Sequence, residues 1–180
     1  MRLYSATDGY IDYLRMYHKH VYSNKENARV NMRKYIGFIV EENRYKYFIP
    51  LSSPKDSDFV TVNGEKMIKK DSFLIFRIVS SRADPELKAS IRFANMIPVP
   101  SSELIMYDVD GETDNNYRNL ILEELEYIRK KEDRIIKRAK VIYRKKCSGN
   151  KEKVFEKCLD YKDLERLHDA WIEHISNAII

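Results

Sequence analysis

Residues 1–110 contain many short strand-like segments, with no helix of crossover length between them. Runs of β-branched and aromatic residues bounded by turn residues predict strands at Met1–Tyr4, Arg33–Val40, Tyr45–Leu51, Phe59–Val62, Glu65–Ile68, Phe73–Val79, Ala89–Ala94 and Met96–Val99. Strands without crossover helices pair antiparallel. We therefore expect an α+β fold in which most of these eight segments, up to six or seven, form a twisted antiparallel sheet or a partly open barrel.

Helical periodicity dominates the second half of the chain. Apolar residues at three- and four-residue spacings predict helices at Gly9–Tyr17, Tyr117–Lys146, Lys151–Leu159 and Lys162–Ile175. Thr7 or Asp8 is expected to cap the first helix, and Ser148-Gly149-Asn150 to end the second. A chain of 180 residues suits a single domain. Its sheet core would lie in residues 1–110 and its long basic helix and C-terminal helices in residues 114–180.

The composition favours an acidic partner and argues against several protein classes. The net charge is +5, and 13 tyrosines offer rings that stack on unpaired bases, as RNA-binding proteins do. We expect a cytoplasmic protein, since neither a signal peptide nor an apolar run of membrane-spanning length is present. Cys147 and Cys158 lack zinc-site spacing and are expected to be free thiols.

The segment F-I-P-L-S-S-P-K, residues 48–55, is the most informative stretch for function. Ser52, Ser53 and Lys55 follow a strand end, where Pro54 stops the ladder. In an antiparallel hairpin, Arg33 and Lys34 at the start of the preceding strand come close to these residues. Converging cations and hydroxyls predict a phosphate site. The alternatives are a serine turn with a solvated lysine, or an Arg33 or Lys34 that points across the pleat.

A second cationic feature lies on the predicted long helix. Residues 129–146 carry ten Lys or Arg against two acids, and Arg129, Lys130, Arg134, Lys137 and Arg138 begin this run. Such an imbalance favours contact with nucleic acid, although a solvated helix face is the common alternative. The sequence has no P-loop, dinucleotide, zincin or nucleophile-elbow motif.

If RNA is the partner, it supplies its own nucleophile, the 2′-hydroxyl. Cleavage by internal attack on the adjacent phosphate then needs a proton acceptor, a proton donor and cations for the developing charge. Serine, lysine, arginine and tyrosine can position the phosphate and neutralise it. No histidine or carboxylate obviously joins this cluster, so the residues alone predict a basic RNA-binding domain that could also cleave RNA.

Four stretches resemble the toxin of type III toxin–antitoxin systems, the ToxN/AbiQ family of endoribonucleases. They are M-R-L-Y-S-A-T-D-G-Y-I-D-Y-L at the start, R-K-Y-I-G-F-I-V at 33–40, Y-K-Y-F-I-P-L-S-S-P-K at 45–55, and N-M-I-P-V-P at 95–100 followed by N-Y-R-N-L-I-L-E-E-L-E-Y-I-R-K at 116–130. Their order and spacing hold over most of residues 1–145.

This resemblance implies a fold similar to the MazF/Kid-like toxin barrel. It implies a sequence-selective endoribonuclease that needs no metal or cofactor and leaves a 2′,3′-cyclic phosphate. It also implies that an antitoxin RNA of pseudoknotted repeats is processed by the toxin, inhibits it and joins it in a closed protein–RNA assembly. A role in phage defence by abortive infection is implied too.

The resemblance also assigns site residues by position. Ser53, Lys55, Arg33 and Tyr10 are expected to be catalytic. Arg33 stands where relatives can have lysine and stays protonated, so a neutral amine would have to come from Lys34 or Lys55. RNA contacts are expected from Ser52, Lys34, Arg29, Tyr117, Arg118, Arg129, Lys130, Arg134, Lys137 and Arg138.

Two other functions stay open at this point. The main alternative is a non-catalytic RNA-binding protein that uses the basic helix, since no histidine joins the serines. A DNA-binding regulator is a weaker reading, because no helix-turn-helix pattern lies near the basic helix. RNA cleavage that depends on Ser53 separates the first function from both alternatives.

Overall fold

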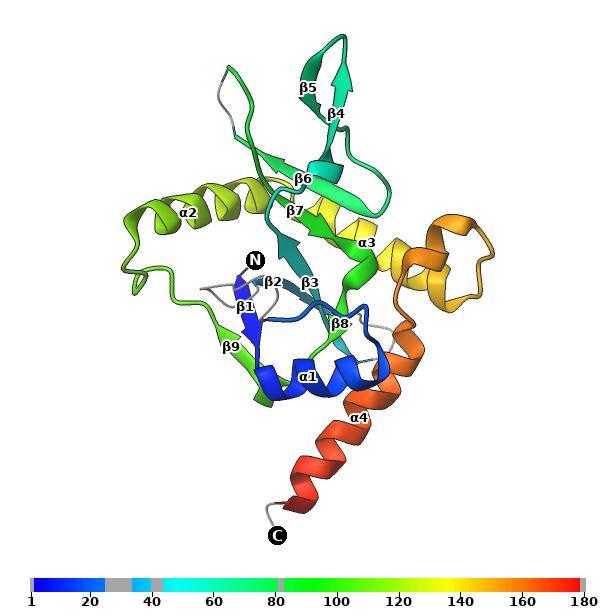
Figure 1. Cartoon of the computed structure of the whole chain (residues 1–180). Helices are drawn as coiled ribbons and strands as arrows, with labels where there is room; N and C mark the ends of the chain where they lie inside the picture. Colours follow the sequence, from blue (N-terminus) through cyan, green and yellow to red (C-terminus); the bar gives the residue numbers. More distant parts are fainter. Residues whose placement is uncertain (1, 25–33, 40–43, 81–82, 179–180) are drawn as a thin grey trace.

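An open antiparallel sheet forms the centre of the fold (Figure 1). The computed structural model describes residues 2–24, 34–39, 44–80 and 83–178. The strands are β1 (Leu3–Ala6), β2 (Tyr35–Ile39), β3 (Lys46–Ser52), β4 (Phe59–Val62), β5 (Glu65–Ile68), β6 (Ile75–Val79), β7 (Leu87–Arg92), β8 (Ile97–Pro98) and β9 (Leu104–Met106). The strand order is β6-β7-β3-β2-β1-β9, and β8 also pairs with β3.

The expected α+β class and antiparallel sheet are confirmed, but the sheet is not a closed barrel. Its strand path ends on β6 at one side and on β9 at the other, with no pairing between these two strands among the described residues. The strand β9 was not predicted, because Leu104–Met106 is too short to show a period. The Asn63-Gly64 hairpin of β4 and β5 is confirmed, with φ angles of 51° and 85° that suit this turn.

Strand β3 is the central strand of the sheet. It pairs with β2 from Lys46 to Pro50, with β8 at Tyr47 and Phe48, and with β7 at Leu51 and Ser52. The predicted hairpin of β2 and β3 is thus confirmed, and its register places Lys34 opposite Leu51, whose N–H donates to the Lys34 carbonyl at 2.9 Å. Consecutive residues of β3, such as Tyr47, Phe48 and Ile49, are buried, so both faces of this strand are covered by the core.

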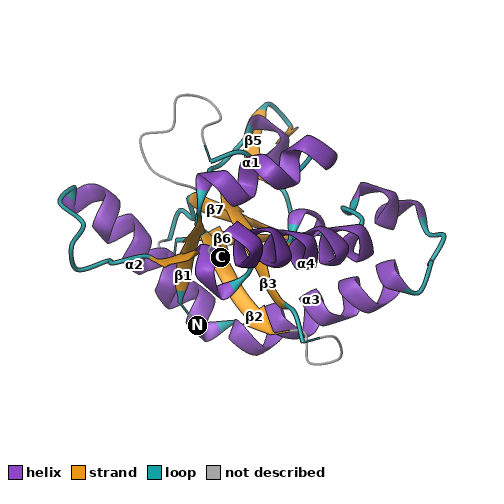
Figure 2. Ribbon diagram, turned by 90° about the horizontal axis from the view of Figure 1, so that it is seen from below, coloured by secondary structure: helices purple, strands orange, loops and turns teal. Residues whose placement is uncertain are grey.

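The helices pack at two places against the sheet. They are α1 (Asp8–Tyr17), α2 (Asn115–Lys130), α3 (Glu132–Cys147) and α4 (Tyr161–Ala178). Helices α1 and α4 pack together beside β8, whereas α2 contacts β6 and β7 (Figure 1, Figure 2). Helix α3 joins the two groups by packing on α4. No described helix has the length and apolarity of a membrane-spanning segment.

The predicted single helix over Tyr117–Lys146 is wrong, because the chain bends at Lys131. There φ is −120° and ψ is 12°, and the Lys131 N–H donates to the Ile128 carbonyl in a tight turn. The apolar spacing continues across this bend because Ile128 and Ile135 are both buried, on helices that pack against different elements. The helix predicted at Lys151–Leu159 is also wrong, since only a 3-10 turn at Lys153–Lys157 forms there.

Tyr10 lies in the core between α1 and α4. Its side chain is 0% exposed, and its hydroxyl donates to the Pro98 carbonyl at 2.7 Å. Burial raises the pKa of this hydroxyl well above its usual range, so it remains a hydrogen-bond donor. Pro98 pairs with Tyr47, which is six residues along β3 from Ser53, or roughly 20 Å at strand rise. The expected catalytic contact of Tyr10 with RNA therefore does not fit its position.

Replacing Tyr10 by Phe should reduce the free energy of unfolding by about 1–2 kcal/mol, because the Pro98 carbonyl loses its donor inside the core. Urea denaturation followed by circular dichroism measures this loss. Tyr17→Phe is the control, since Tyr17 is 58% exposed on the same helix and should tolerate the change. Equal stability of the two variants would contradict a structural role for the Tyr10 hydroxyl.

Candidate active site

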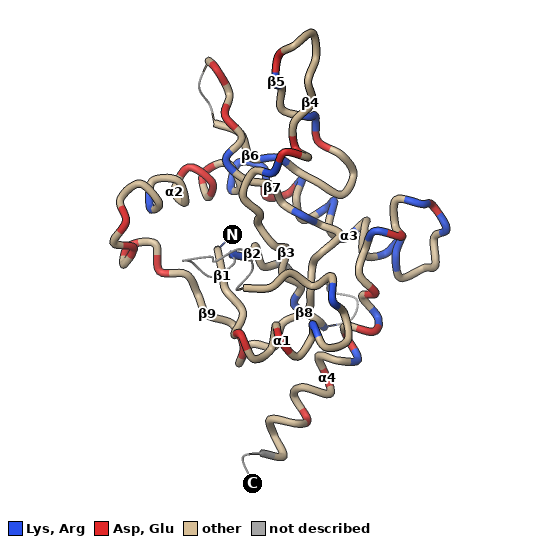
Figure 3. The backbone as a smooth tube through the Cα atoms, in the orientation of Figure 1, with Lys and Arg blue, Asp and Glu red and all other residues tan. Residues whose placement is uncertain are grey.

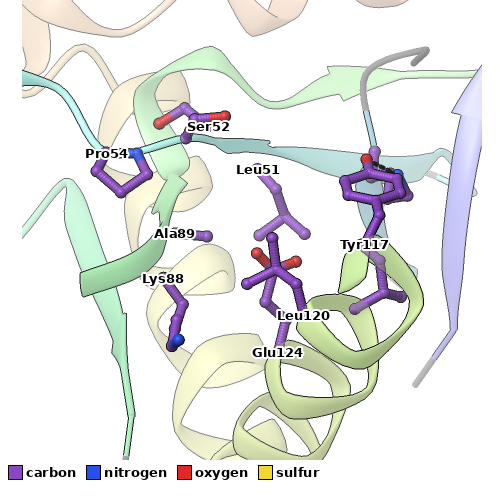
Figure 4. A pocket seen from close by; sticks show the side chains of 11 residues that line it. Leu51, Ser52, Pro54, Lys88, Ala89, Tyr117, Leu120 and Glu124 are labelled. Carbon is purple, nitrogen blue, oxygen red and sulfur yellow. Dashed lines mark hydrogen bonds between the residues drawn. The ribbon is translucent and has the colours of Figure 1, made fainter. Parts of the chain in front are cut away.

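A pocket opens where β3 gives way to the turn that follows it. It lies between the end of β3, the start of β7 and the first half of α2, and its volume is about 200 Å³ (Figure 4). Leu51, Leu120 and Ile121 form an apolar part of its wall. Its polar lining consists of Lys34, Ser52, Ser53, Lys88, Tyr117 and Glu124. The sequence prediction that Lys34 lies near the two serines is therefore confirmed.

Lys34 places a buried positive charge in this pocket. The residue is 5% exposed, and its ammonium donates a hydrogen bond to the Tyr117 hydroxyl. The Nζ atom also lies 4.2 Å from the ring centroid of Tyr107 and 4.0 Å from that of Tyr117. Aromatic faces attract a cation and replace part of its lost hydration. Tyr117, expected as an RNA contact, thus also holds Lys34 in the pocket.

The two serines of the turn at residues 52–55, called the serine turn below, differ in their environment. Ser52 is 1% exposed, and its hydroxyl accepts a hydrogen bond from Arg92 Nε at 2.9 Å and donates to the Ser90 carbonyl at 3.5 Å. Ser53 is exposed at the pocket. Ser53 is therefore positioned to meet a ligand, whereas the Ser52 hydroxyl already has protein partners.

A buried ionic network holds this turn in place. Asp58 is 0% exposed and accepts hydrogen bonds from Arg77 at 3.1 Å and from Arg92 at 2.6 Å. The same carboxylate accepts the Lys55 N–H at 3.1 Å. Arg92 thus links Asp58 to Ser52, and the network joins the turn to β6 and β7.

Sequence reasoning missed this network, although a signal existed. Arg77 and Arg92 each interrupt an apolar strand, in F-L-I-F-R-I-V and S-I-R-F. A charge at a core-facing strand position requires a buried partner of opposite sign. Asp58, three residues after Lys55, is an acid in the neighbouring turn that could have been proposed as that partner.

The other predicted site residues are more dispersed. Lys55 is exposed on the turn, with its Nζ 5.4 Å from the centroid of the Tyr22 ring. Arg118 is half-buried in the first turns of α2, next to Tyr117. Arg29 and Arg33 lie outside the described residues.

The cations at the end of α2 and along α3 are partly engaged with the protein. Lys130 pairs with Glu126 at 2.6 Å, and the guanidinium groups of Arg134 and Arg138 lie 5.3 and 5.2 Å from the centroid of the Phe76 ring. Arg129 borders a different pocket, beside β9, and Lys137 is exposed. Lys and Arg outnumber the acids along α3, whereas α2 carries the two kinds of charge in equal number (Figure 3).

Glu124 brings a carboxyl group into the pocket. It is 5% exposed, and burial raises its pKa to about 7, although Lys34 and Lys88 act in the opposite direction. The described residues contain no group of three or more histidine, cysteine or acidic side chains that could hold a metal ion.

Comparisons with known proteins find relatives along nearly the whole chain. The family model for the toxin ToxN of type III toxin–antitoxin systems matches residues 2–169. Endoribonuclease AbiQ of Lactococcus lactis subsp. lactis is 30% identical over 165 residues, which cover 92% of this chain and 86% of that protein. Endoribonuclease ToxN of Bacillus thuringiensis subsp. kurstaki is 26% identical, with the same coverage of 92% and 86%.

Solved structures share the whole fold. A structure from a study of type III systems, in which a non-coding RNA pseudoknot selectively inhibits the toxin, has a TM-score of 0.79 at 25% identity. It covers 96% of this chain and 98% of its own. AbiQ, described as a lactococcal anti-phage endoribonuclease of a type III system, has a TM-score of 0.78 at 26% identity, with the same coverage of 96% and 98%.

The open sheet, with helices packed against it at two places, is thus the architecture of a type III toxin. The chain belongs to the ToxN family of type III toxin–antitoxin systems. The resemblance drawn from the sequence is confirmed at this level.

Replacing Asp58 by Asn should destabilise the protein by about 3–5 kcal/mol, because Arg77 and Arg92 would keep buried charges without a counter-ion. Chemical denaturation measures this loss. Asp56→Asn is the matched control in the same turn, where the side chain is fully exposed and pairs with Lys66 on the surface. It should change stability little, and an equal loss in both variants would show that the turn, not the network, is responsible.

Glu124 should make the protein less stable as the pH rises. Its pKa is raised from 4.5 to about 7 in the folded state, so folding favours the protonated form and this contribution is lost between these two pH values. The loss amounts to about 3 kcal/mol at 1.36 kcal/mol per pH unit. Urea denaturation at several pH values should therefore show that Glu124→Gln flattens this slope and stabilises the protein at pH 8.

Glu126→Gln is the control for this pH series, because Glu126 lies on the same helix with its carboxylate on the surface. Its stability should follow the wild-type pH dependence. A Glu124→Gln protein that follows it as well would show that the Glu124 carboxyl titrates equally in the folded and unfolded states.

Proposed function

We propose that this chain is the endoribonuclease toxin of a type III toxin–antitoxin system and cuts RNA within the pocket at the end of β3. The observation that carries the proposal is a pocket lined by both the exposed Ser53 and the buried Lys34, in a chain of the ToxN family. Relatives along nearly the whole chain are named endoribonucleases, which supports this activity.

The proposed reaction is attack of a ribose 2′-hydroxyl on the adjacent phosphate, without a metal ion, leaving a 2′,3′-cyclic phosphate. Ser53 and Lys55 would position the 2′-hydroxyl and the scissile phosphate. Lys34, fixed by Tyr117, would stabilise the charge that develops on the phosphate oxygens. Arg33 would help to stabilise this charge, because the family resemblance places it at a catalytic position. We also propose that the twisted sheet is similar to the MazF/Kid-like toxin barrel.

The proposed partners follow from the family and from charge. The antitoxin would be a pseudoknotted repeat RNA that the toxin processes and that inhibits it in a closed assembly, and cellular and phage RNAs would be substrates in the cytoplasm. The net charge of +5 and the cations of α3 support contact with an RNA backbone. The anti-phage function named for AbiQ supports a role in abortive infection.

Purified protein in excess EDTA should cut a mixed RNA pool and leave 2′,3′-cyclic phosphate ends. Ser53→Ala should reduce the rate at least about a hundredfold while binding antitoxin RNA normally, because one positioning group is lost. Ser102→Ala, at an exposed serine away from the pocket, is the control and should cut RNA normally.

Two results would contradict parts of this proposal. A Ser53→Ala protein with full activity would remove Ser53 from the mechanism. Tight, salt-sensitive RNA binding without any cleavage, after co-purifying RNA has been excluded, would favour the non-catalytic RNA-binding function instead.

A further inference from the structure

The pocket contains a carboxyl group that the proposed function does not use. Glu124 rises from α2 into the pocket below Leu51 (Figure 4). It lies on the wall opposite the serine turn, on the same helix as Tyr117, one to two turns further along.

Glu124 differs from the other buried carboxylates of the described residues. Asp58 pairs with two arginines, Glu103 accepts a hydrogen bond from Thr7, and Glu165 accepts from Tyr47 at 3.0 Å and pairs with Lys162 at 2.9 Å. For Glu124, no hydrogen bond or ion pair with another described residue is present, although it is 5% exposed. Burial of a carboxylate without such a partner opposes folding, so Glu124 does not serve stability as the other three do.

The groups that face Glu124 come from each element around the pocket. Lys34 approaches from the start of β2, Lys88 from β7, and Tyr117 from α2 itself, while the serine turn forms the remaining side. Lys88 is committed to Glu86 at 2.9 Å and Glu123 at 3.5 Å. Neither lysine forms an ion pair with Glu124, so its carboxyl group still faces the pocket.

We propose that Glu124 is the general base of the ribonuclease reaction and accepts the proton of the attacking 2′-hydroxyl. This inference rests on the proposed function. Lys34 and Glu124 line the same pocket. In this proposal, Lys34 stabilises the phosphate and Glu124 accepts the hydroxyl proton. Such a pair supplies the proton acceptor that the serines, lysines and arginines of the sequence motif lack.

The reaction balances with these groups. The 2′-oxygen loses its proton to the Glu124 carboxylate and forms a bond to phosphorus, while the bond from phosphorus to the 5′-oxygen breaks. The leaving 5′-oxygen takes a proton from a water molecule. The hydroxide formed from that water takes the proton held by Glu124, which restores the carboxylate and leaves a cyclic phosphate and a 5′-hydroxyl.

The environment of Glu124 suits this role. A general base works best when its pKa is close to the working pH, and burial raises the pKa of Glu124 to about 7. Because the base must be ionised, cleavage should become faster as the pH rises towards 7 and level off above it. Among the residues that the structure describes, Lys34, Lys88 and Tyr117 are the other titratable groups of the pocket.

Single-turnover cleavage of an RNA substrate from pH 5.5 to 8.5 tests the inference with Glu124→Gln, which keeps the shape of the side chain. We expect a rate reduction of about a hundredfold or more at pH 8, loss of the rise with pH, and unchanged RNA affinity. Glu124→Asp should retain part of the activity and the rise with pH. Glu126→Gln, on the same helix, should behave as the wild type.

The outcomes separate this inference from the proposed function. If the wild type does not cut RNA, both are wrong. If the wild type cuts, Ser53→Ala does not, and Glu124→Gln cuts with the wild-type rate and pH profile, only the inference about Glu124 is wrong. Faster cleavage by Glu124→Gln above pH 7 would also overturn it, because the carboxylate would then act only by repelling the phosphate.

Discussion

The buried carboxylate of Asp58 is the constraint on which the candidate site depends. Its two arginine partners come from β6 and β7, and its third partner is the backbone of Lys55 in the turn after β3. A single acidic group thereby joins three segments that are distant in sequence. Because Arg92 also reaches Ser52, the position of the serine turn follows from the pairing of β6 with β7 as much as from β3 itself.

At the serine turn, the residues that hold the structure in place differ from the residues that line the pocket. Asp58 accepts hydrogen bonds from Arg77 and Arg92, and Arg92 donates to Ser52, so these groups bind one another inside the protein. Ser53, Lys34 and Glu124 line the pocket. Two adjacent serines therefore have different tasks, one held by an arginine and one open to a ligand. A buried ionic network is a suitable support because losing one member leaves the others unpaired.

The sequence predicted the local parts of this site, the family resemblance added Tyr117, and Glu124 was missed. The hairpin of β2 and β3 and the approach of Lys34 to the serines follow from the strand and turn residues and from antiparallel pairing. Tyr117 and Glu124 enter the pocket only because α2 packs on β6 and β7, which no local pattern reveals. The bend at Lys131 was missed for a similar reason, since the apolar period is the same on both sides while the packing partner changes. Tyr10 matched a family position, yet the structure gives it a core hydrogen bond.

The two walls of the pocket come from segments that are far apart in the sequence, since Tyr117 lies 64 residues after Ser53. The serine turn and Lys34 lie near the start, whereas Tyr117 and Glu124 lie on α2, after β9 has returned to pair with β1. During synthesis, a chain that has not yet released α2 from the ribosome has the serines but no pocket. A protein whose proposed substrate is RNA would thus complete its site only after most of its own message has been read.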